Sequence, residues 1–239
     1  MKTKGTVLIT GGAQRIGRYL ALHLAEEGYD IALHYNHSLE MARETADSIQ
    51  GLGRRCTLFK ADFGQMADVR RLIPEVIVAC PDCCILVNNA SIFEKANLLE
   101  TEEDLFDRHF QINFKTPFFL TRDFARRVSE GQVINLIDTK AARTVVEYFA
   151  YTLTKKALLE FTRMAAKALG PGIRVNGIAP GLILPPPGED EAYLQDRCHS
   201  VPLKRIGSPE GILCALRYLL ENEFTTGDCL YIDGGEHLK

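Results

Sequence analysis

Two ionisable side chains near the middle of the chain are four residues apart. Tyr151 and Lys155 lie in the stretch 149–169, whose apolar spacing predicts an α-helix, so both side chains share one helical face. A phenol with a pKa near ~10 is a poor acid at neutral pH. A neighbouring ammonium favours the phenolate and lowers that pKa, which makes the tyrosine a usable proton donor. The pair therefore indicates proton transfer, although an ordinary solvated helix face can carry the same spacing.

Asp138 follows an apolar run and precedes Tyr151 by thirteen residues. A carboxylate beside the tyrosine can relay a proton or raise the local proton affinity. The same carboxylate would repel the oxyanion that forms when a carbonyl is reduced. Phe93, after another apolar run, offers a surface on which a flat ring can stack. The alternatives are that Asp138 caps a helix or loop and that Phe93 packs in the core.

A glycine-rich turn, Thr10 to Gly17, joins the first expected strand to the first expected helix. Glycines let the backbone approach a pyrophosphate, which the helix N-terminus then attracts. An NAD-selective site usually has an acidic residue after the second strand, and this chain has none there. The turn contributes Gly11, Arg15 and Ile16, and the second strand ends in the donors His34, Tyr35, Asn36, His37 and Ser38. Because an arginine fork suits a 2′-phosphate, the sequence predicts NADPH over NADH.

Two further stretches come directly after expected strands. Asp62 and Phe63 follow the third strand, where a carboxylate can accept a hydrogen bond from adenine. Asn89, Ala90 and Ser91 follow the fourth, where they are expected along the nicotinamide half, and Ser91 can also reach substrate. Turn chemistry after a strand is the alternative for both stretches.

The elements that position these residues alternate along the chain. Strands are expected at 6–10, 30–35, 55–60, 84–88, 132–137, 173–178 and 229–232, and helices from Ile16 to about 27 and at 38–51, 66–79, 102–128, 149–169 and 208–221. Such alternation predicts a single α/β domain over 1–239: a doubly wound, Rossmann-type, mostly parallel sheet of about seven strands with helices on both faces. The proline-rich connection within 182–200 leaves a strand at the edge where ligands bind, and we expect it to be a substrate lid.

Composition excludes several classes of function. A net charge of −3 gives no reason to expect nucleic acid or an anionic membrane as partner, and no apolar run approaches the ~20 residues of a membrane span. We expect a cytoplasmic protein without an export signal. The seven cysteines are an odd number, which favours reduced thiols. The run Cys80 to Cys84 lacks a second ligand pair for zinc, so packed thiols are expected rather than a metal site.

The order and spacing of these motifs resemble the short-chain dehydrogenase/reductase family from Thr10 to Gly235. The matching positions are the glycine-rich turn, Asn88-Asn89-Ala90, Asn113, Tyr151 with Lys155, Pro180-Gly181 and Asp233-Gly234-Gly235. The resemblance implies that Tyr151 is the catalytic acid, that Lys155 binds the nicotinamide ribose, and that Asn113 supports a water-linked proton relay. It also implies that Pro180 and Gly181 contact cofactor, and that the protein is a homotetramer built partly through 102–128 and 149–169.

Two departures from the family pattern narrow the resemblance to its pteridine reductase branch, which includes dihydromonapterin reductases. Asp138 stands where the family commonly has serine, and Arg15 replaces the middle glycine of the turn. The branch implies NADPH-dependent reduction of a pterin C=N bond, as in 7,8-dihydromonapterin or dihydrofolate, with Arg15, Ser91, Phe93, Asp138 and Tyr151 at the substrate. A carbonyl or 3-oxoacyl reductase of the same fold, and a non-catalytic NADPH-binding regulator, are the alternatives. Arg197 and His199 could hold a substrate tail, but an exposed helix face is the simpler interpretation.

Overall fold

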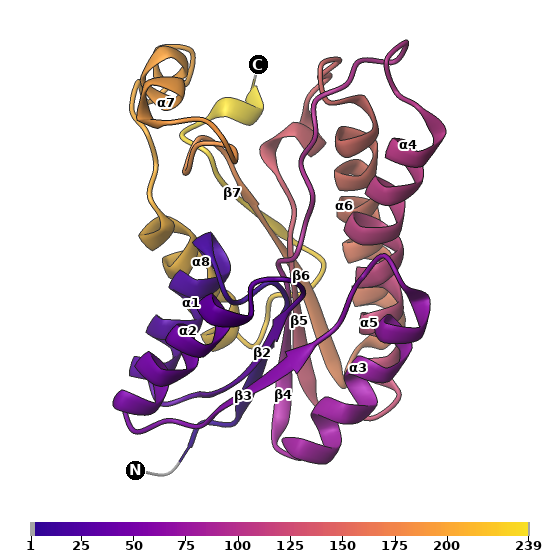
Figure 1. Ribbon diagram of the computed structural model, residues 1–239, viewed down its shortest axis with the longest axis vertical. Coiled ribbons are helices and arrows are strands. Elements are labelled where there is room, and N and C mark those ends of the chain that lie inside the picture. The colour runs from indigo at the N-terminus through magenta and orange to yellow at the C-terminus, as the bar shows by residue number, and fades with distance from the viewer. Residues whose placement is uncertain (1–2, 239) are drawn as a thin grey trace.

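Seven parallel strands form one sheet in the computed structural model, which describes residues 3–238 (Figure 1). The spatial order is β3-β2-β1-β4-β5-β6-β7, so the order reverses between β1 and β4. The strands are β1 (Thr6–Ile9), β2 (Asp30–Tyr35), β3 (Cys56–Lys60), β4 (Cys83–Asn88), β5 (Gly131–Leu136), β6 (Ile173–Pro180) and β7 (Cys229–Ile232). The predicted α/β doubly wound sheet is confirmed, and every strand pair in it is parallel.

Helices cover both faces of this sheet. Helices α1 (Arg15–Glu26), α2 (Leu39–Gly51) and α8 (Pro209–Glu221) lie on one face, and α3 (Met66–Ala79), α5 (Thr116–Ala125) and α6 (Phe149–Leu169) on the other (Figure 1). Consecutive residues of a strand point to opposite faces. Ile9 therefore packs with Leu20 and Leu24 of α1, while its neighbour Leu8 packs with Leu120 of α5. Burial on both sides explains why the strands are continuously apolar.

The helical stretch expected over 102–128 is confirmed from Glu103 to Ala125, but it is not a uniform α-helix. The chain forms α4 (Glu103–Phe110), a π-helical turn η1 (Gln111–Lys115), and then α5. Pro117 has no N–H to donate to the carbonyl four residues earlier. The Thr116 N–H and hydroxyl both turn to the carbonyl of Gln111, five residues back, the hydroxyl at 2.8 Å. The π turn carries Asn113 and buries its side chain.

Three short elements have no counterpart in the sequence prediction. They are the 3₁₀ turns η2 (Thr139–Ala142) and η3 (Glu236–Leu238), and helix α7 (Glu191–Cys198) inside the 182–200 connection. η2 begins directly after Asp138. Its position is held by the C-terminal segment, because the Thr139 hydroxyl donates to Asp233 at 2.5 Å and Arg143 pairs with Glu236 at 2.6 Å.

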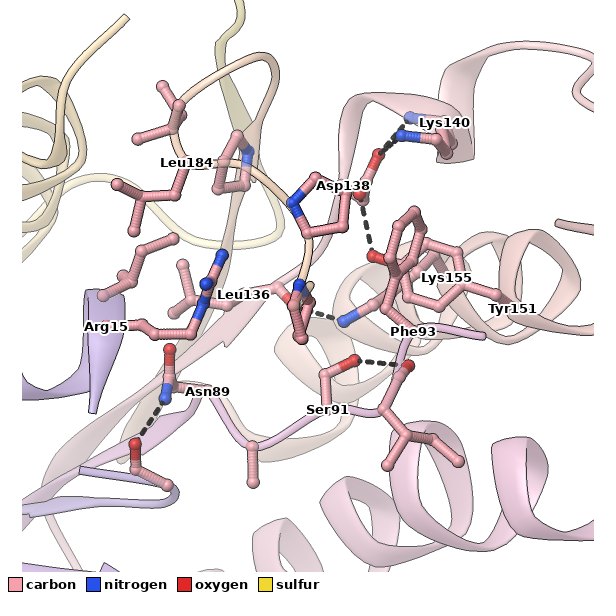
Figure 2. A pocket seen from close by; sticks show the side chains of 18 of the residues that line it. Arg15, Asn89, Ser91, Phe93, Leu136, Asp138, Lys140, Tyr151, Lys155 and Leu184 are labelled. Atoms are coloured by element: carbon pink, nitrogen blue, oxygen red, sulfur yellow. Dashed lines mark hydrogen bonds and ion pairs between the residues drawn. The ribbon is translucent and has the colours of Figure 1, made fainter. Parts of the chain in front are cut away.

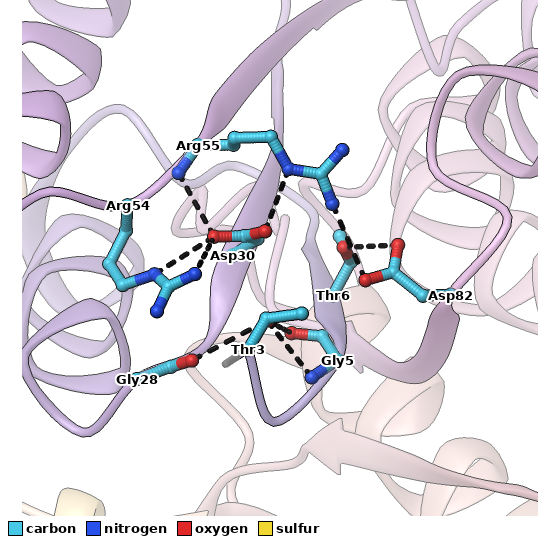
Figure 3. Close-up of polar contacts among 8 residues, drawn as sticks. All are labelled: Thr3, Gly5, Thr6, Gly28, Asp30, Arg54, Arg55 and Asp82. Atoms are coloured by element: carbon cyan, nitrogen blue, oxygen red, sulfur yellow. Dashed lines mark hydrogen bonds and ion pairs between the residues drawn. The ribbon is translucent and has the colours of Figure 1, made fainter. Parts of the chain in front are cut away.

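The edge of the sheet opposite the carboxyl ends of the strands is stabilised by a cluster of charges (Figure 3). Asp30, at the start of β2, is 2% exposed. It accepts hydrogen bonds from the Arg54 guanidinium at 3.0 Å, and from the Arg55 backbone and side chain at 3.0 and 2.8 Å. Asp82 joins the cluster through Arg55 at 3.4 Å and the Thr6 hydroxyl at 2.9 Å. Burial alone would raise the pKa of Asp30, but the bonds from Arg55 and Arg54 outweigh it and lower the pKa below 3.8.

The cysteine run spans the connection from α3 to β4. Cys80 and Cys83 are buried, and burial raises the pKa of Cys83 to about 12, so this thiol is a poor nucleophile. The expected packing of these thiols is confirmed. Over residues 3–238, no group of three or more His, Cys, Asp or Glu side chains is arranged to hold a metal, and no helix is long and apolar enough to cross a membrane.

Candidate active site

A cavity of about 980 Å³ opens beyond the carboxyl ends of the strands, where ligands bind on doubly wound sheets. Its lining includes eighteen of the twenty residues expected at the site: Gly11, Arg15, Ile16, His34, Tyr35, Asn36, His37, Ser38, Phe63, Asn89, Ala90, Ser91, Phe93, Asp138, Tyr151, Lys155, Pro180 and Gly181. The two exceptions are Asp62 and Asn113. The connection 182–200 contributes Ile183, Leu184, Tyr193, Arg197 and other residues to the lining, so it borders the cavity as expected.

The glycine-rich turn fits a pyrophosphate. Gly11 has a φ of 63°, and a Cβ on Gly17 would lie 2.2 Å from the Gly11 carbonyl oxygen. The start of α1 therefore packs directly on the turn. Asn89 holds the turn from β4, donating to the carbonyls of Thr10 at 2.8 Å and Gly11 at 3.1 Å (Figure 2). No side chain of residues 3–238 caps the N-terminus of α1, so its first N–H groups remain available to an anion.

Arg15 occupies the left-handed region with a φ of 52°. Glycine adopts this backbone conformation freely, whereas for a residue with a side chain it costs about 1–2 kcal/mol of folding free energy. The guanidinium enters the cavity and donates from Nη2 to the carbonyl of Pro185 at 2.5 Å. It thus joins the turn to the 182–200 connection. Such strain at a cavity is typical of a functional residue.

His34 uses both ring nitrogens for hydrogen bonds to the protein backbone. Its side chain is buried; Nδ1 accepts from the Gly11 N–H at 3.0 Å, and Nε2 donates to the Ala61 carbonyl at 3.0 Å. The ring also stacks on Phe63, with centroids 4.0 Å apart. Burial lowers the pKa of His34 to about 4, so the imidazole is neutral at pH 7. With both ring nitrogens engaged, His34 positions the glycine-rich turn, and the phosphate donors that remain are on Arg15, His37 and Ser38.

Asp62 lies outside the cavity lining. Its Oδ1 accepts from the Gly64 N–H at 2.9 Å and from the Asn36 amide at 3.3 Å. These are the turn contacts that the sequence left open as the alternative. Asp62 therefore orients Asn36, which does line the cavity.

The central contact of the site is a hydrogen bond from the Tyr151 hydroxyl to Asp138 Oδ2 at 2.8 Å (Figure 2). Burial, and then the charge and hydrogen bond of Asp138, raise the pKa of Tyr151 well above its usual value. The other carboxylate oxygen accepts from the Lys140 N–H at 2.7 Å and lies 3.7 Å from its ammonium. Asp138 is thus a cap of η2 and a partner of the tyrosine at once.

Lys155 does not lower the pKa of Tyr151, and the expectation that it would is wrong here. Its Nζ donates to the Leu136 carbonyl at 2.9 Å and lies 5.6 Å from the Tyr151 ring centroid. The pKa of Lys155 is itself lowered to about 8, because burial outweighs the attraction of Asp138. Lys155 still lines the cavity beside Tyr151, so its position suits binding of a ribose hydroxyl.

Asn113 does not line the cavity but bonds a loop that does. Its Oδ1 accepts from the Ile92 N–H at 2.9 Å and the Ser91 hydroxyl at 3.1 Å, and its Nδ2 donates to the Ile92 carbonyl at 2.9 Å. These bonds hold the 91–93 loop, which presents Ser91 and Phe93 to the cavity. The described contacts make Asn113 a support of this loop.

Phe93 lies between Tyr151 and a neighbour that the sequence did not single out. Its ring meets Tyr151 edge-on at a centroid distance of 4.7 Å and stacks on Tyr148 at 4.3 Å. Lys140, Arg143, Tyr148 and Tyr193 also line the cavity without having been predicted as substrate or cofactor residues, and so does Arg197, which the sequence left open between a substrate tail and an exposed helix face. Tyr148 precedes Tyr151 by one helical turn, which was the available signal. The others lie on η2, after it, or on α7, elements that the sequence pattern did not reveal.

The fold and this site define a nucleotide-dependent oxidoreductase. A family model described as enoyl-(acyl carrier protein) reductase matches residues 11–237. A short-chain type dehydrogenase/reductase of Picea abies is 31% identical, over 96% of this chain and 91% of that one. The chain belongs to the short-chain dehydrogenase/reductase family, as the sequence motifs indicated.

Two similar solved structures belong to FolM alternative dihydrofolate reductase 1 in complex with NADP. The Brucella suis structure is 36% identical, with a TM-score of 0.94, covering 100% of this chain and 97% of that chain. The Brucella canis structure is also 36% identical, with a TM-score of 0.92, covering 99% of this chain and 95% of that chain.

Proposed function

We propose that this protein is an NADPH-dependent reductase of a dihydropterin C=N bond, such as that of 7,8-dihydromonapterin or a related compound. The observation that carries the proposal is the 2.8 Å hydrogen bond from Tyr151 to Asp138, in a cavity that Phe93 also lines. A carboxylate in this place disfavours a developing oxyanion but suits protonation of a ring nitrogen. The NADP complexes of the two FolM structures support the same class of reaction.

The reaction requires a hydride on carbon and a proton on nitrogen, and bound NADPH supplies the hydride. Tyr151 remains protonated at neutral pH because its pKa is raised, so it holds the proton at its hydroxyl. Asp138 is 18% exposed, so its carboxylate lies within reach of solvent. When the hydroxyl protonates the substrate nitrogen, the phenolate that forms takes a proton from solvent, which the Asp138 carboxylate relays along the 2.8 Å bond. Phe93 and Ser91 position the pterin ring.

Arg15, His37 and Ser38 would hold the 2′-phosphate of NADPH, and the N-terminus of α1 the pyrophosphate. Lys155, Asn89, Pro180 and Gly181 would lie along the nicotinamide ribose. The connection 182–200 would close over both ligands, with Arg15 linking it to the turn. In steady-state kinetics we expect a clear preference for NADPH, and a preference for NADH would overturn this assignment.

The activity is tested by following NADPH oxidation with 7,8-dihydromonapterin, dihydrobiopterin and dihydrofolate beside a panel of ketones. We expect turnover of dihydropterins. Asp138→Ser and Asp138→Asn should each reduce dihydropterin kcat by roughly a hundredfold, since general acid catalysis contributes about that much. Both side chains can still cap η2, so unfolding midpoints serve as the control. Reduction of ketones alone, or an unchanged rate in both variants, would overturn the proposal.

We also propose a homotetramer built partly through α4–α5 and α6. The support is a set of large apolar side chains exposed on these helices: Phe106, Phe118, Leu153 and Met164. Multi-angle light scattering at micromolar concentration should give four times the chain mass of 26.7 kDa.

A further inference from the structure

The two oxygens of the Asp138 carboxylate face different partners (Figure 2). Oδ2 accepts the hydrogen bond from the Tyr151 hydroxyl at 2.8 Å. Oδ1 accepts from the Lys140 backbone N–H at 2.7 Å and lies 3.7 Å from the Lys140 ammonium. One oxygen therefore faces the proton donor of the proposed reaction, and the other faces a second side chain that carries exchangeable protons.

The Lys140 ammonium is held beside the carboxylate by aromatic rings of the cavity lining. Its Nζ lies 5.3 Å from the Phe93 centroid and 5.8 Å from the Tyr148 centroid. Because the electron-rich rings and the carboxylate all attract a cation, they restrict where the ammonium can lie. The side chain is still 23% exposed, so water reaches it.

Two other cations of the cavity lining lie on elements that flank Asp138, and neither can take the place of Lys140. Lys155, on α6, is 3% exposed, and its Nζ is occupied by a hydrogen bond to a backbone carbonyl. Arg143, at the end of η2, is paired with a carboxylate, and a guanidinium does not lose a proton in proteins. Lys140 alone of these three combines an ionisable ammonium with contact to water.

We propose that Lys140 is the outer member of a proton relay: its ammonium positions the Asp138 carboxylate and supplies the proton that Asp138 returns to Tyr151. The inference rests on the proposed role of Tyr151 as proton donor. It adds the residue through which that donor regains its proton between turnovers.

The relay conserves protons at each step. The Lys140 ammonium gives one proton to Oδ1 of Asp138, and the flexible lysine stem lets Nζ close the 3.7 Å gap. A half-turn of the carboxyl group about its Cβ–Cγ bond carries this proton to the Tyr151 phenolate, and the neutral amine then takes a proton from water. Ammonium and phenol groups have similar acidity in water, so the transfer is nearly balanced. The raised pKa of Tyr151 favours its phenolate as the acceptor.

The first test separates the first turnover from the later ones. Lys140→Arg keeps the positive charge, but a guanidinium does not release a proton. The first turnover uses the proton already on Tyr151, so NADPH oxidation with enzyme in excess of dihydropterin should keep its wild-type rate. The steady-state kcat requires a reloaded Tyr151 and should fall roughly tenfold. Equal slowing of both rates would indicate a merely structural role and overturn the relay.

Lys156→Met is the matched control for the structure of η2. The Lys156 Nζ donates to the Ala141 carbonyl at 3.0 Å, so this lysine supports the same turn without contacting Asp138. The ratio of the single-turnover rate to kcat should stay at the wild-type value in this variant. The same change of ratio as in Lys140→Arg would assign the effect to the shape of the turn and overturn the relay.

The second test asks whether a proton or only a charge is needed. Lys140→Ala leaves the backbone N–H bond to Asp138 in place and should also lower kcat. Added ethylammonium should restore kcat in proportion to its concentration, whereas tetramethylammonium, which has the same charge and no N–H, should not. Restoration by both cations, or by neither, would overturn proton supply by Lys140.

The same measurements distinguish the relay from the proposed substrate. Reduction of dihydropterins with unchanged kcat in both Lys140 variants would overturn the relay alone. Reduction of ketones in place of dihydropterins, with the expected pattern in these variants, would overturn the proposed substrate alone, because any substrate protonated by Tyr151 requires the donor to be reloaded. Absence of turnover with every substrate would overturn both.

Discussion

His34 fixes the glycine-rich turn to the end of β3 through both ring nitrogens. Nδ1 must remain unprotonated to accept from the Gly11 N–H, and burial enforces that state by lowering the pKa to about 4. In the unfolded chain the imidazole titrates near ~6.5. The shape of the cofactor turn is therefore coupled to the protonation of one buried side chain.

This coupling predicts a loss of stability in mild acid. Between pH 6.5 and pH 4 the unfolded state binds a proton that folded His34 does not, so the free energy of unfolding falls with pH by roughly 3 kcal/mol. Urea unfolding at pH 7.0 and pH 4.5 measures the difference. The pKa values of Asp30 and Asp233 are lowered in the folded protein, so the stability that these two carboxylates provide is lost mainly below pH 3.8. His34→Asn keeps an acceptor near Gly11 and should lose most of this pH dependence; an equal dependence in both proteins would contradict the argument.

Arg15 combines backbone strain with a side chain that we propose holds the 2′-phosphate of NADPH. Arg15→Gly should therefore raise the free energy of unfolding by about 1 kcal/mol, because glycine adopts a φ of 52° without a clash. The same change should raise KM for NADPH by roughly tenfold and leave KM for NADH nearly unchanged. Denaturant titration and cofactor kinetics measure the two effects. A destabilised variant would mean that the Pro185 contact outweighs the strain.

Much of the site chemistry could be predicted because it depends on residue type and spacing. Asp138, Tyr151 and Lys155 follow strands or share a helix face, and the sheet brings such residues together. The direction of the Tyr151 pKa shift could not be predicted, because it depends first on how deeply the phenol is buried and then on whether the aspartate or the lysine is the nearer partner. Likewise, no pattern distinguishes a histidine that binds phosphate from one that binds backbone.

At the scale of elements, the π turn η1 interrupts the regular α-helix and places Asn113 beside the cavity loop. Asn113 faces the 91–93 loop from this turn and bonds the backbone of Ile92 in both directions. A straight α-helix over 102–128 would place later residues on a different face. Helix 66–79 matches its prediction residue for residue, although Pro74 lies inside it. The sequence signal for η1 was Pro117, the second residue of α5, which follows the π turn directly.

Asn113→Ala should therefore act on the loop and through it on the substrate. We expect a loss of about 2 kcal/mol in the free energy of unfolding, since two backbone groups of Ile92 lose their partner. KM for dihydropterin should rise, because Phe93 is no longer held, and KM for NADPH should change less. Ser91→Ala removes the 3.1 Å contact to Asn113 and a 3.3 Å contact to the Ile92 carbonyl but leaves the bonds from Asn113 to the Ile92 backbone, so it is the matched control, with a smaller loss expected. Equal losses in both variants would place the stabilising bond at Ser91.

At the scale of the whole molecule, the candidate active site and a stabilising charge cluster lie at opposite ends of the parallel strands. The cavity that Asp138 and Tyr151 line lies beyond the carboxyl ends of the strands, and the Asp30 cluster lies at the opposite ends (Figure 3). The doubly wound sheet and the location of the cavity could be predicted, since alternating strands and helices allow few topologies. Helix α7 inside the 182–200 connection could not be predicted, because it is short and the side chains that it directs toward the cavity are aromatic and basic, without an apolar period.

Asp30→Asn tests this separation. The substitution leaves Arg54, whose side chain is 12% exposed, without its charged partner, and removing one member of a buried pair typically costs about 3 kcal/mol. For a chain of this length, that loss corresponds to a fall in Tm of roughly 6–12 °C. At 25 °C, kcat and KM for NADPH should remain at wild-type values, because no residue of the cluster lines the cavity. Arg43→Gln, which removes an exposed ion pair with Glu40, is the matched control and should shift Tm by less than about 2 °C. A drop in kcat without a drop in Tm would show that the two edges of the sheet are coupled, and that the Asp30 cluster positions β2 and its cofactor-binding end.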